Sequence, residues 1–341
     1  MIHPPSGAQG RRRVIRAPNH LGDVVMGLPA MLDDGGDIAV RQWLAPLVEM
    51  AAPGRPVIAV GRGWRGWSAA AARVRRGRYD EGVLLSPAFS AALLFRMAGV
   101  GRLRGTATDG RSFLLADRIP RSALRGMHRI DQYRLLLGQE RGRDPRHPAL
   151  TPPEATVASW RDRLGGASGP VVGLFPGSNA GARRWPLDRY REVAGALANR
   201  GARVVVLGGP GDLERTAQVA AAAPGGVDAG GQTDLQGLAA LLSLCQVVVT
   251  NDTGPLHLAA AVGAPTVSVW GPSDPDEVAP GGTRHARITG PPLPCKPCLK
   301  NECRRRGKGT VLDLAHEECM NLVPVAPVLN AVEALLERDV R

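Results

Sequence analysis

Residues 246–272 read QVVVTNDTGPLHLAAAVGAPTVSVWGP. A run of strand-forming residues ends in the polar seam 251–255, an alanine-rich helical pattern follows, and a second apolar run ends at Trp270. Strands that alternate with helices form βαβ units, and such units build parallel sheets. The stretch therefore predicts a strand, a helix and a second strand of one parallel sheet.

The same alternation extends in both directions along the chain, and a polar, proline-rich stretch at 141–153 interrupts it as an expected linker. Strands are expected at 14–17, 57–60, 82–86, 171–177 and 203–209, and helices at 22–32, 89–100, 130–140, 186–201 and 328–339. The prediction is an α/β protein of two Rossmann-like domains, 1–150 and 151–341, whose parallel sheets face a cleft. The last helix either stays with the second domain or returns to the first.

Composition narrows the class of protein. The chain has 341 residues, 44% of them hydrophobic, and a net charge of +12 from 43 Lys and Arg against 31 Asp and Glu. This excess favours anionic partners, although a GC-rich genome that encodes arginine often explains it equally well. No apolar run is long enough to span a membrane, and the stretch after Arg11–Arg13 is too short and polar for a signal peptide. We expect an intracellular protein.

Ligands of open parallel sheets bind beyond the carboxyl ends of the strands, so the strand-to-helix turns are the places to search. The first turn, Asn19-His20-Leu21-Gly22-Asp23, opens the helix at 22–32. Asp23 at or near the N-cap either caps this helix or acts as a general base, and the local sequence does not separate the two roles.

The second turn, FPGSNAGARRWP at 175–186, combines small residues with two arginines just before a helix. Small residues let backbone N–H groups approach a ligand, and a helix N-terminus favours an anion. Because cations are disfavoured at that end, Arg183 and Arg184 suggest a bound phosphate. The alternative is a solvated basic loop.

The third turn is the polar seam of the opening stretch. Asp252 or Thr253 is able to cap the helix that begins near Pro255, but one cap does not explain both residues or His257 in the first turn. The seam therefore points to an anionic ligand. Gly208-Gly209 after another strand is only part of a dinucleotide fingerprint and is a weak signal.

Four of the five cysteines lie close together in sequence: Cys295, Cys298, Cys303 and Cys319. A C-x₂-C pair with two further thiols is able to hold a structural zinc ion. Reduced thiols that happen to cluster are the alternative, because disulfides are rare inside cells.

Taken together, these turns resemble those of bacterial lipopolysaccharide heptosyltransferases of glycosyltransferase family 9. Three blocks and the cysteine-rich tail carry the resemblance: NHLGDVVMGLPA (19–30), FPGSNAGARRWP (175–186), NDTGPLHLAAAVGAPTVSVWGPSDP (251–275) and CKPC at 295–298 with the two later cysteines. NHLGD and the tail look more like heptosyltransferase II than heptosyltransferase I.

The resemblance implies a GT-B fold and inverting transfer of heptose from ADP-heptose to the lipid A-linked inner core, without a catalytic metal or other cofactor. It implies that the first domain binds the acceptor and the second the ADP-sugar. The catalytic aspartate of the family falls on Asp23, with Asn19 and Gly22 in the acceptor-side turn. The donor-binding positions fall on Ser178, Arg183, Asp252, Thr253, Gly254 and His257.

Two positions depart from the family pattern. Arg183 stands where lysine is common, and Gly211 stands where an acidic residue often follows the glycine turn, so Asp212 or Glu214 would have to contact the ribose. The resemblance further implies a cytoplasmic enzyme at the inner face of the membrane. Two alternatives stay open: a family 9 transferase with another donor or acceptor, and a non-catalytic nucleotide-binding or nucleic-acid-binding protein. With 4% aromatic residues and no basic stripe interleaved with them, we expect no nucleic-acid partner.

Overall fold

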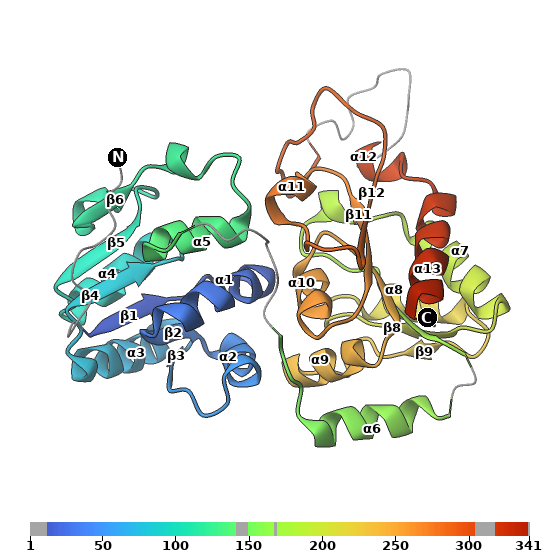
Figure 1. Ribbon diagram of the computed structural model, residues 1–341, viewed down its shortest axis with the longest axis horizontal. Coiled ribbons are helices and arrows are strands. Elements are labelled where there is room, and N and C mark those ends of the chain that lie inside the picture. The colour runs from blue at the N-terminus through green and yellow to red at the C-terminus, as the bar shows by residue number, and fades with distance from the viewer. Residues whose placement is uncertain (1–11, 141–148, 167–168, 304–317, 340–341) are drawn as a thin grey trace. The chain divides into compact units, whose positions relative to one another are not determined.

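A computed structural model describes residues 12–140, 149–166, 169–303 and 318–339. The chain divides into two compact units, Met1–Pro148 and Ala149–Arg341, and each contains a six-stranded sheet with helices (Figure 1). Every strand pairing described in these sheets is parallel. The predicted α/β class with two parallel sheets is therefore confirmed. Most of the expected linker, residues 141–148, lies outside the described residues.

Unit 1 has the strand order β3-β2-β1-β4-β5-β6. Its strands are β1 (Arg13–Arg16), β2 (Asp37–Arg41), β3 (Val57–Val60), β4 (Glu81–Leu84), β5 (Arg102–Thr106) and β6 (Asp117–Ile119). Its helices are α1 (Leu21–Asp34), α2 (Ala45–Ala51), α3 (Gly63–Gly77), α4 (Phe89–Met97) and α5 (Arg129–Leu137), with the short 3₁₀ turns η1 (Gln42–Leu44), η2 (Ser112–Leu114) and η3 (Arg121–Leu124).

Helix α1 shows how the sequence sets these elements. It begins after His20, whose extended backbone forms the N-cap, and it ends at Gly35, whose positive φ of 79° stops the helix. Its buried face comes from apolar residues at helical spacing, such as Val24, Leu28 and Met31. The helix predicted at 22–32 is therefore confirmed.

Unit 2 has the strand order β12-β11-β10-β7-β8-β9. Its strands are β7 (Val171–Phe175), β8 (Arg203–Val206), β9 (Val227–Asp228), β10 (Val247–Asn251), β11 (Thr266–Trp270) and β12 (His285–Thr289). Its helices are α6 (Glu154–Leu164), α7 (Leu187–Asn199), α8 (Leu213–Ala221), α9 (Leu235–Ser243), α10 (Gly254–Ala261), α11 (Pro275–Val278), α12 (Glu318–Asn321) and α13 (Val325–Asp339), with η4 (Gly181–Arg183). The opening stretch forms β10, α10 and β11, as its pattern predicts.

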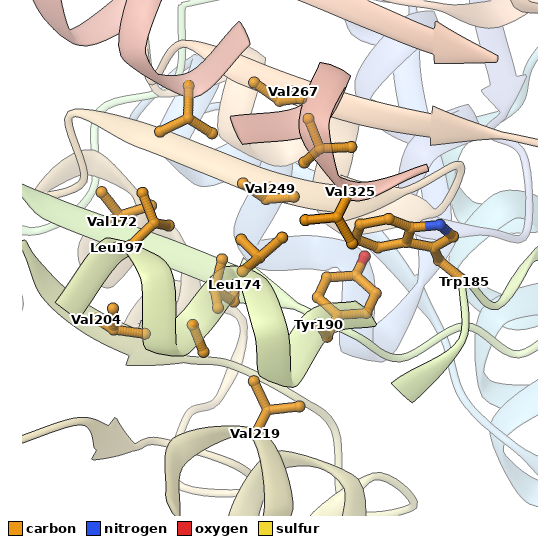
Figure 2. Close-up of a cluster of buried hydrophobic side chains, with 14 of the residues drawn as sticks. Val172, Leu174, Trp185, Tyr190, Leu197, Val204, Val219, Val249, Val267 and Val325 are labelled. Carbon is orange, nitrogen blue, oxygen red and sulfur yellow. The ribbon is translucent and has the colours of Figure 1, made fainter. Parts of the chain in front are cut away.

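The core of unit 2 lies between its sheet and helices α7, α8 and α13. Valines from neighbouring strands, such as Val172 and Val249, meet Trp185 and Tyr190 there (Figure 2), and the two aromatic rings stand edge to face with centroids 5.2 Å apart. Helix α13 adds Val325, Val328, Val332 and Leu335 to this cluster. These residues pack within unit 2, and the return of the last helix to the first domain stays a prediction.

In the part of the chain that the structure describes, none of the helices has the length and apolar character needed to cross a membrane.

Candidate functional site

Each sheet has one position where the chain changes the direction in which it adds strands. In unit 1 this switch point lies between β1 and β4, and in unit 2 it lies between β7 and β10. Loops that leave two neighbouring strands in opposite directions open a crevice at the carboxyl edge, where ligands of such sheets bind. The predicted turns at 19–23, 175–186 and 251–255 all leave strands at these switch points.

Asn251, the last residue of β10, joins the two loops at the switch point of unit 2. Its fully buried amide donates from Nδ2 to the carbonyl oxygens of Pro176 (3.1 Å) and Gly177 (3.2 Å), and its Oδ1 accepts the backbone N–H of Trp185 at 3.0 Å. One side chain thus fixes both ends of the 176–185 loop. No role of Asn251 was predicted from the sequence, although an asparagine at the end of a buried strand is a usable signal.

Replacing Asn251 by Ala should lower the free energy of unfolding by about 2–4 kcal/mol, because three buried backbone groups lose their partner. Thermal unfolding checks this, with Thr250→Val as the matched control. Thr250 is equally buried on the same strand, but its hydroxyl makes one hydrogen bond, to the carbonyl oxygen of Asn251. Equal losses for the two variants would contradict a special role of Asn251.

Arg183 and Asp252 meet across the same two loops. Nη1 of Arg183 lies 3.0 Å from Oδ2 of Asp252, with 29% of the arginine side chain and 5% of the aspartate side chain exposed. The neighbouring Arg184 donates from Nε to the carbonyl oxygen of Ser178 at 2.8 Å. The two arginines, which suggested a phosphate between them, therefore each have a protein partner. The side chain of Arg183 remains partly open to solvent.

The start of α10 does not match a simple capping cluster. Thr253 occupies the N-cap position with extended backbone but makes no side-chain cap hydrogen bond. Thr253 and Gly254 are half-buried, whereas His257 is only 4% exposed. Thr253 and Gly254, at the positive end of the helix, are therefore more accessible than Asn251, Asp252 and Pro255 of the same seam.

Two further loop residues support the 176–185 loop. Ser178 is buried, and its Oγ accepts the backbone N–H of Ala180 at 3.2 Å. Asp212, in the turn after β8, accepts the N–H of Gly209 at 3.2 Å, and a Cβ at Gly177 would overlap its carboxylate. Glu214, by contrast, is exposed and accepts from Gln218. Asp212 is therefore the acidic residue held at this edge of the sheet.

In unit 1, Asp23 lies in the first turn of α1, and His20 occupies the N-cap position without a side-chain bond. The Asp23 carboxylate instead accepts the hydroxyl of Tyr133, on α5, at 2.9 Å. Burial raises the pKa of the Tyr133 phenol well above its usual value, and the charge of Asp23 raises it further. Tyr133 is therefore a hydrogen-bond donor to the half-buried carboxylate of Asp23. Asp23 does not occupy the N-cap position of α1, which was one of its two predicted roles.

Replacing Tyr133 by Phe should lower kcat about tenfold if the hydroxyl positions the Asp23 carboxylate. Steady-state kinetics measures this effect, and thermal unfolding of the same variant is the control. A lower melting temperature with an unchanged kcat would show a purely structural role.

Asn19 bridges the switch point of unit 1. Its Nδ2 donates to Oγ of Ser86 at 2.9 Å, and its Oδ1 accepts from Nη2 of Arg16 at 2.8 Å and from Nε of Arg41 at 3.1 Å. Burial, together with the nearby charge of Arg41, lowers the pKa of Arg16 to about 10. Two guanidinium groups thus converge on one neutral amide.

A cavity of about 890 Å³ opens beside this cluster. Three arginines and three tryptophans line it, with no acidic side chain: Arg16, Arg41, Arg62, Trp43, Trp64 and Trp67. This cavity was not predicted from the sequence, because most of its lining comes from residues 41–67, where no motif stands out. Its charge suits an anionic ligand with apolar or sugar-ring surfaces.

The four clustered cysteines are free thiols, three of them in the segment 295–303, which touches the 176–185 loop, and Cys319 on α12. The N–H of Cys298 donates to the carbonyl oxygen of Pro272 at 3.0 Å, and the carbonyl oxygen of Asn301 accepts the N–H of Ala182 at 3.0 Å. Burial raises the pKa of Cys319 to about 11, and the thiols of the other three contribute to the rise. Among the described residues, no three His, Cys, Asp or Glu side chains are arranged to hold a metal ion.

The sequence profile of glycosyltransferase family 9 (heptosyltransferase) matches residues 67–308. The chain belongs to glycosyltransferase family 9. Lipopolysaccharide heptosyltransferase 2 of Salmonella typhimurium is 31% identical to this family 9 glycosyltransferase over 226 residues, which cover 61% of this chain and 64% of that protein. The Escherichia coli K12 protein of the same name is 28% identical over 283 residues, 78% of each chain.

Solved structures of other proteins have the same fold as this family 9 glycosyltransferase. The structure of E. coli ADP-heptose LPS heptosyltransferase II matches with a TM-score of 0.80 and 22% identity, covering 97% of this chain and all of that one. E. coli heptosyltransferase WaaC with ADP matches with a TM-score of 0.71 and 20% identity, over 95% of this chain and 99% of that one. The fold is therefore the predicted GT-B class.

Proposed function

We propose that this family 9 glycosyltransferase transfers heptose from ADP-heptose to the lipid A-linked inner core of lipopolysaccharide, with inversion at the anomeric carbon. Its curated relatives carry the name heptosyltransferase, and a solved relative is described with ADP-2-deoxy-2-fluoro heptose. The observation that carries the proposal is the meeting of Arg183 with Asp252 at the switch point of unit 2, beside the N-terminus of α10.

In this proposal unit 2 binds the donor. The partly exposed side chain of Arg183, the backbone N–H groups of Thr253 and Gly254 and the positive end of α10 bind the diphosphate. Asp252 accepts hydrogen bonds from the sugar hydroxyls, because a carboxylate and a phosphate repel each other. The buried residues Ser178 and His257 support the donor site from the 176–185 loop and from α10. Asp212 is the candidate for the ribose contact.

Unit 1 supplies the base. Asp23, held by the Tyr133 hydroxyl, accepts the proton of the acceptor hydroxyl as that oxygen forms a bond to the anomeric carbon. The bond from this carbon to the ADP oxygen breaks, and its electron pair leaves on the diphosphate. Arg183 and the N–H groups of the α10 turn stabilise that charge. Attack from the face opposite the leaving group gives inversion.

The cavity beside Asn19 is the proposed acceptor site. Arg16, Arg41 and Arg62 provide positive charge for the carboxylates and phosphates of an inner-core oligosaccharide, and the tryptophans provide flat surfaces for sugar rings. Gly22 lies buried in the first turn of α1, next to Asp23. An enzyme acting on this acceptor would work in the cytoplasm at the inner face of the membrane.

Catalysis as proposed requires no metal. A structural zinc at Cys295, Cys298, Cys303 and Cys319 stays a separate prediction, and metal analysis of the purified protein tests it. A structural zinc predicts about one zinc per chain that is lost in Cys298→Ser and kept in Cys245→Ala, since Cys245 is buried elsewhere in unit 2. Zinc-free wild-type protein would exclude it.

A panel of sugar nucleotides tests the proposed donor. Calorimetry with ADP-heptose, ADP-glucose and UDP-glucose should show the tightest binding for ADP-heptose, and NMR of the product should show the inverted anomeric configuration. Preferred binding of UDP-glucose would overturn the donor assignment, and retention of configuration would overturn the role of Asp23 as a base for direct attack.

A further inference from the structure

Four large aromatic side chains of unit 1 are exposed to solvent. Trp64 is 75% exposed, Phe113 70%, Trp43 48% and Phe89 38%. Isolated exposed apolar residues need no explanation, but a group of aromatic residues on one surface marks an interaction site.

The topology places them along one edge of the sheet. Trp64 follows β3, Trp43 follows β2, Phe89 follows β4 and Phe113 follows β5. The carboxyl ends of parallel strands lie at the same edge of the sheet. The strand order β3-β2-β1-β4-β5 therefore places the residues along this edge in the order Trp64, Trp43, Phe89, Phe113. We call these four residues the aromatic rim.

Contacts show that the rim is continuous. Trp43, Trp64 and the neighbours of Phe89 in the chain, Ala88 and Ser90, all line the proposed acceptor cavity. The rings of Phe89 and Phe113 lie 6.2 Å apart between centroids and are tilted by 48°. The rim therefore borders the mouth of a cavity that three arginines also line.

The same edge is basic. Arg62 and Arg65 are exposed at the start of α3, and the Arg65 guanidinium lies 5.6 Å from the centre of the Trp64 ring. Arg121 and Arg125 are exposed in the loop after β6. Of the arginines between Glu49 and Asp80, Arg62 and Arg65 lie at this edge, because both stand at the start of α3, directly after β3. The exposed carboxylate of Asp109 is the local exception.

We propose that the aromatic rim and its arginines dock this edge of unit 1 on an anionic lipid bilayer. Tryptophan and phenylalanine partition to the boundary between headgroups and acyl chains, and exposed arginines are attracted to anionic headgroups. The choice of lipid rests on the proposed function, because a lipid A-linked acceptor would reach the cavity from a bilayer. Docking through the rim would bring the mouth of the cavity to the headgroups that carry the acceptor sugars.

Sedimentation of the full chain with vesicles of phosphatidylethanolamine and phosphatidylglycerol tests the proposal without donor or acceptor. Phe113→Ser should weaken binding about five- to tenfold, and the double variant Arg121→Glu with Arg125→Glu should weaken it by more than about tenfold at low salt. Met97→Ser is the matched control. Met97 is 54% exposed at the other end of α4 from Phe89, so its loss should leave binding unchanged.

A second readout separates docking from catalysis. Phe113→Ser should slow transfer to an acceptor embedded in these vesicles and leave transfer to a deacylated, water-soluble acceptor unchanged. Wild-type protein that stays in the supernatant at low salt would overturn the proposal, as would equal losses for Phe113→Ser and Met97→Ser. Self-association abolished by Phe113→Ser, without vesicle binding, would assign the rim to a second copy of the chain. Because vesicle binding needs no sugar nucleotide, a failure of the donor assignment would leave this result unaffected.

Discussion

Replacing Asp23 by Asn should lower the rate of heptose transfer by about 10²- to 10⁴-fold, the usual contribution of a general base. The amide keeps the size of the side chain and an oxygen that accepts the Tyr133 hydroxyl, so the fold of unit 1 should not change. The affinity for ADP-heptose should also be unchanged, because the proposed donor contacts all lie in unit 2. Transfer rates by mass spectrometry and donor affinity by calorimetry measure the two effects.

Asp33→Asn is the control for this substitution. Asp33 lies on the same helix and is exposed, and its replacement by Asn removes the same charge from unit 1. Its transfer rate should stay close to that of the wild type. Substantial transfer by Asp23→Asn would contradict the role of the base, and an equal loss in Asp33→Asn would assign the effect to net charge.

Replacing Arg183 by Ala should weaken the binding of ADP about 10- to 100-fold, the range for a lost charge-assisted hydrogen bond to phosphate. Two effects act in the same direction. The diphosphate loses a positive partner, and the nearly buried carboxylate of Asp252 loses the guanidinium 3.0 Å away. Arg183→Lys keeps the charge without the planar fork, so its affinity should fall between those of Ala and Arg.

A double-mutant cycle separates binding from folding. Arg183→Ala alone should also lower the melting temperature, because a carboxylate that is 5% exposed loses its ion pair. Adding Asp252→Asn removes that charge and should restore the melting temperature but only part of the affinity for ADP, because the diphosphate still lacks its positive partner. Arg191→Ala, in an exposed pair with Asp188 on α7, is the control and should change neither quantity. Unchanged ADP affinity in Arg183→Ala would remove this residue from the phosphate site.

The fold was predictable where strands are buried and apolar. β10 and β11 are buried at every position, so their runs of valine and threonine stood out from the intervening helix. Residues 33–80 gave a weaker signal. Helix α3 fully buries only Ala70 and Val74, with Trp67 and Ala71 packed beside them, so its apolar stripe is short and rich in alanine among glycines and arginines. The edge strand β12, HARIT, is at most half-buried, so its residues alternate between polar and apolar and form no continuous apolar run.

The candidate site was predictable at the level of loops but not of contacts. Glycines, a proline and polar residues at strand ends marked the turns that hold Asp23, Arg183 and Asp252. The partners came from elsewhere in the chain: Tyr133 is 110 residues from Asp23, and its helix shows no motif. Sequence patterns record local periodicity, whereas such pairs depend on which strands become neighbours.

The sugar that the enzyme transfers, and its dependence on Asp23, are measured together in one experiment. The wild-type enzyme and Asp23→Asn are incubated with ADP-heptose and truncated lipid A-linked acceptors, and the products are identified by mass spectrometry. We expect the wild type to add one heptose to an acceptor with release of ADP, and Asp23→Asn to bind the donor without adding the sugar. An acceptor that stays unmodified by the wild type in every mixture, or that gains a different sugar from another nucleotide, would contradict the account.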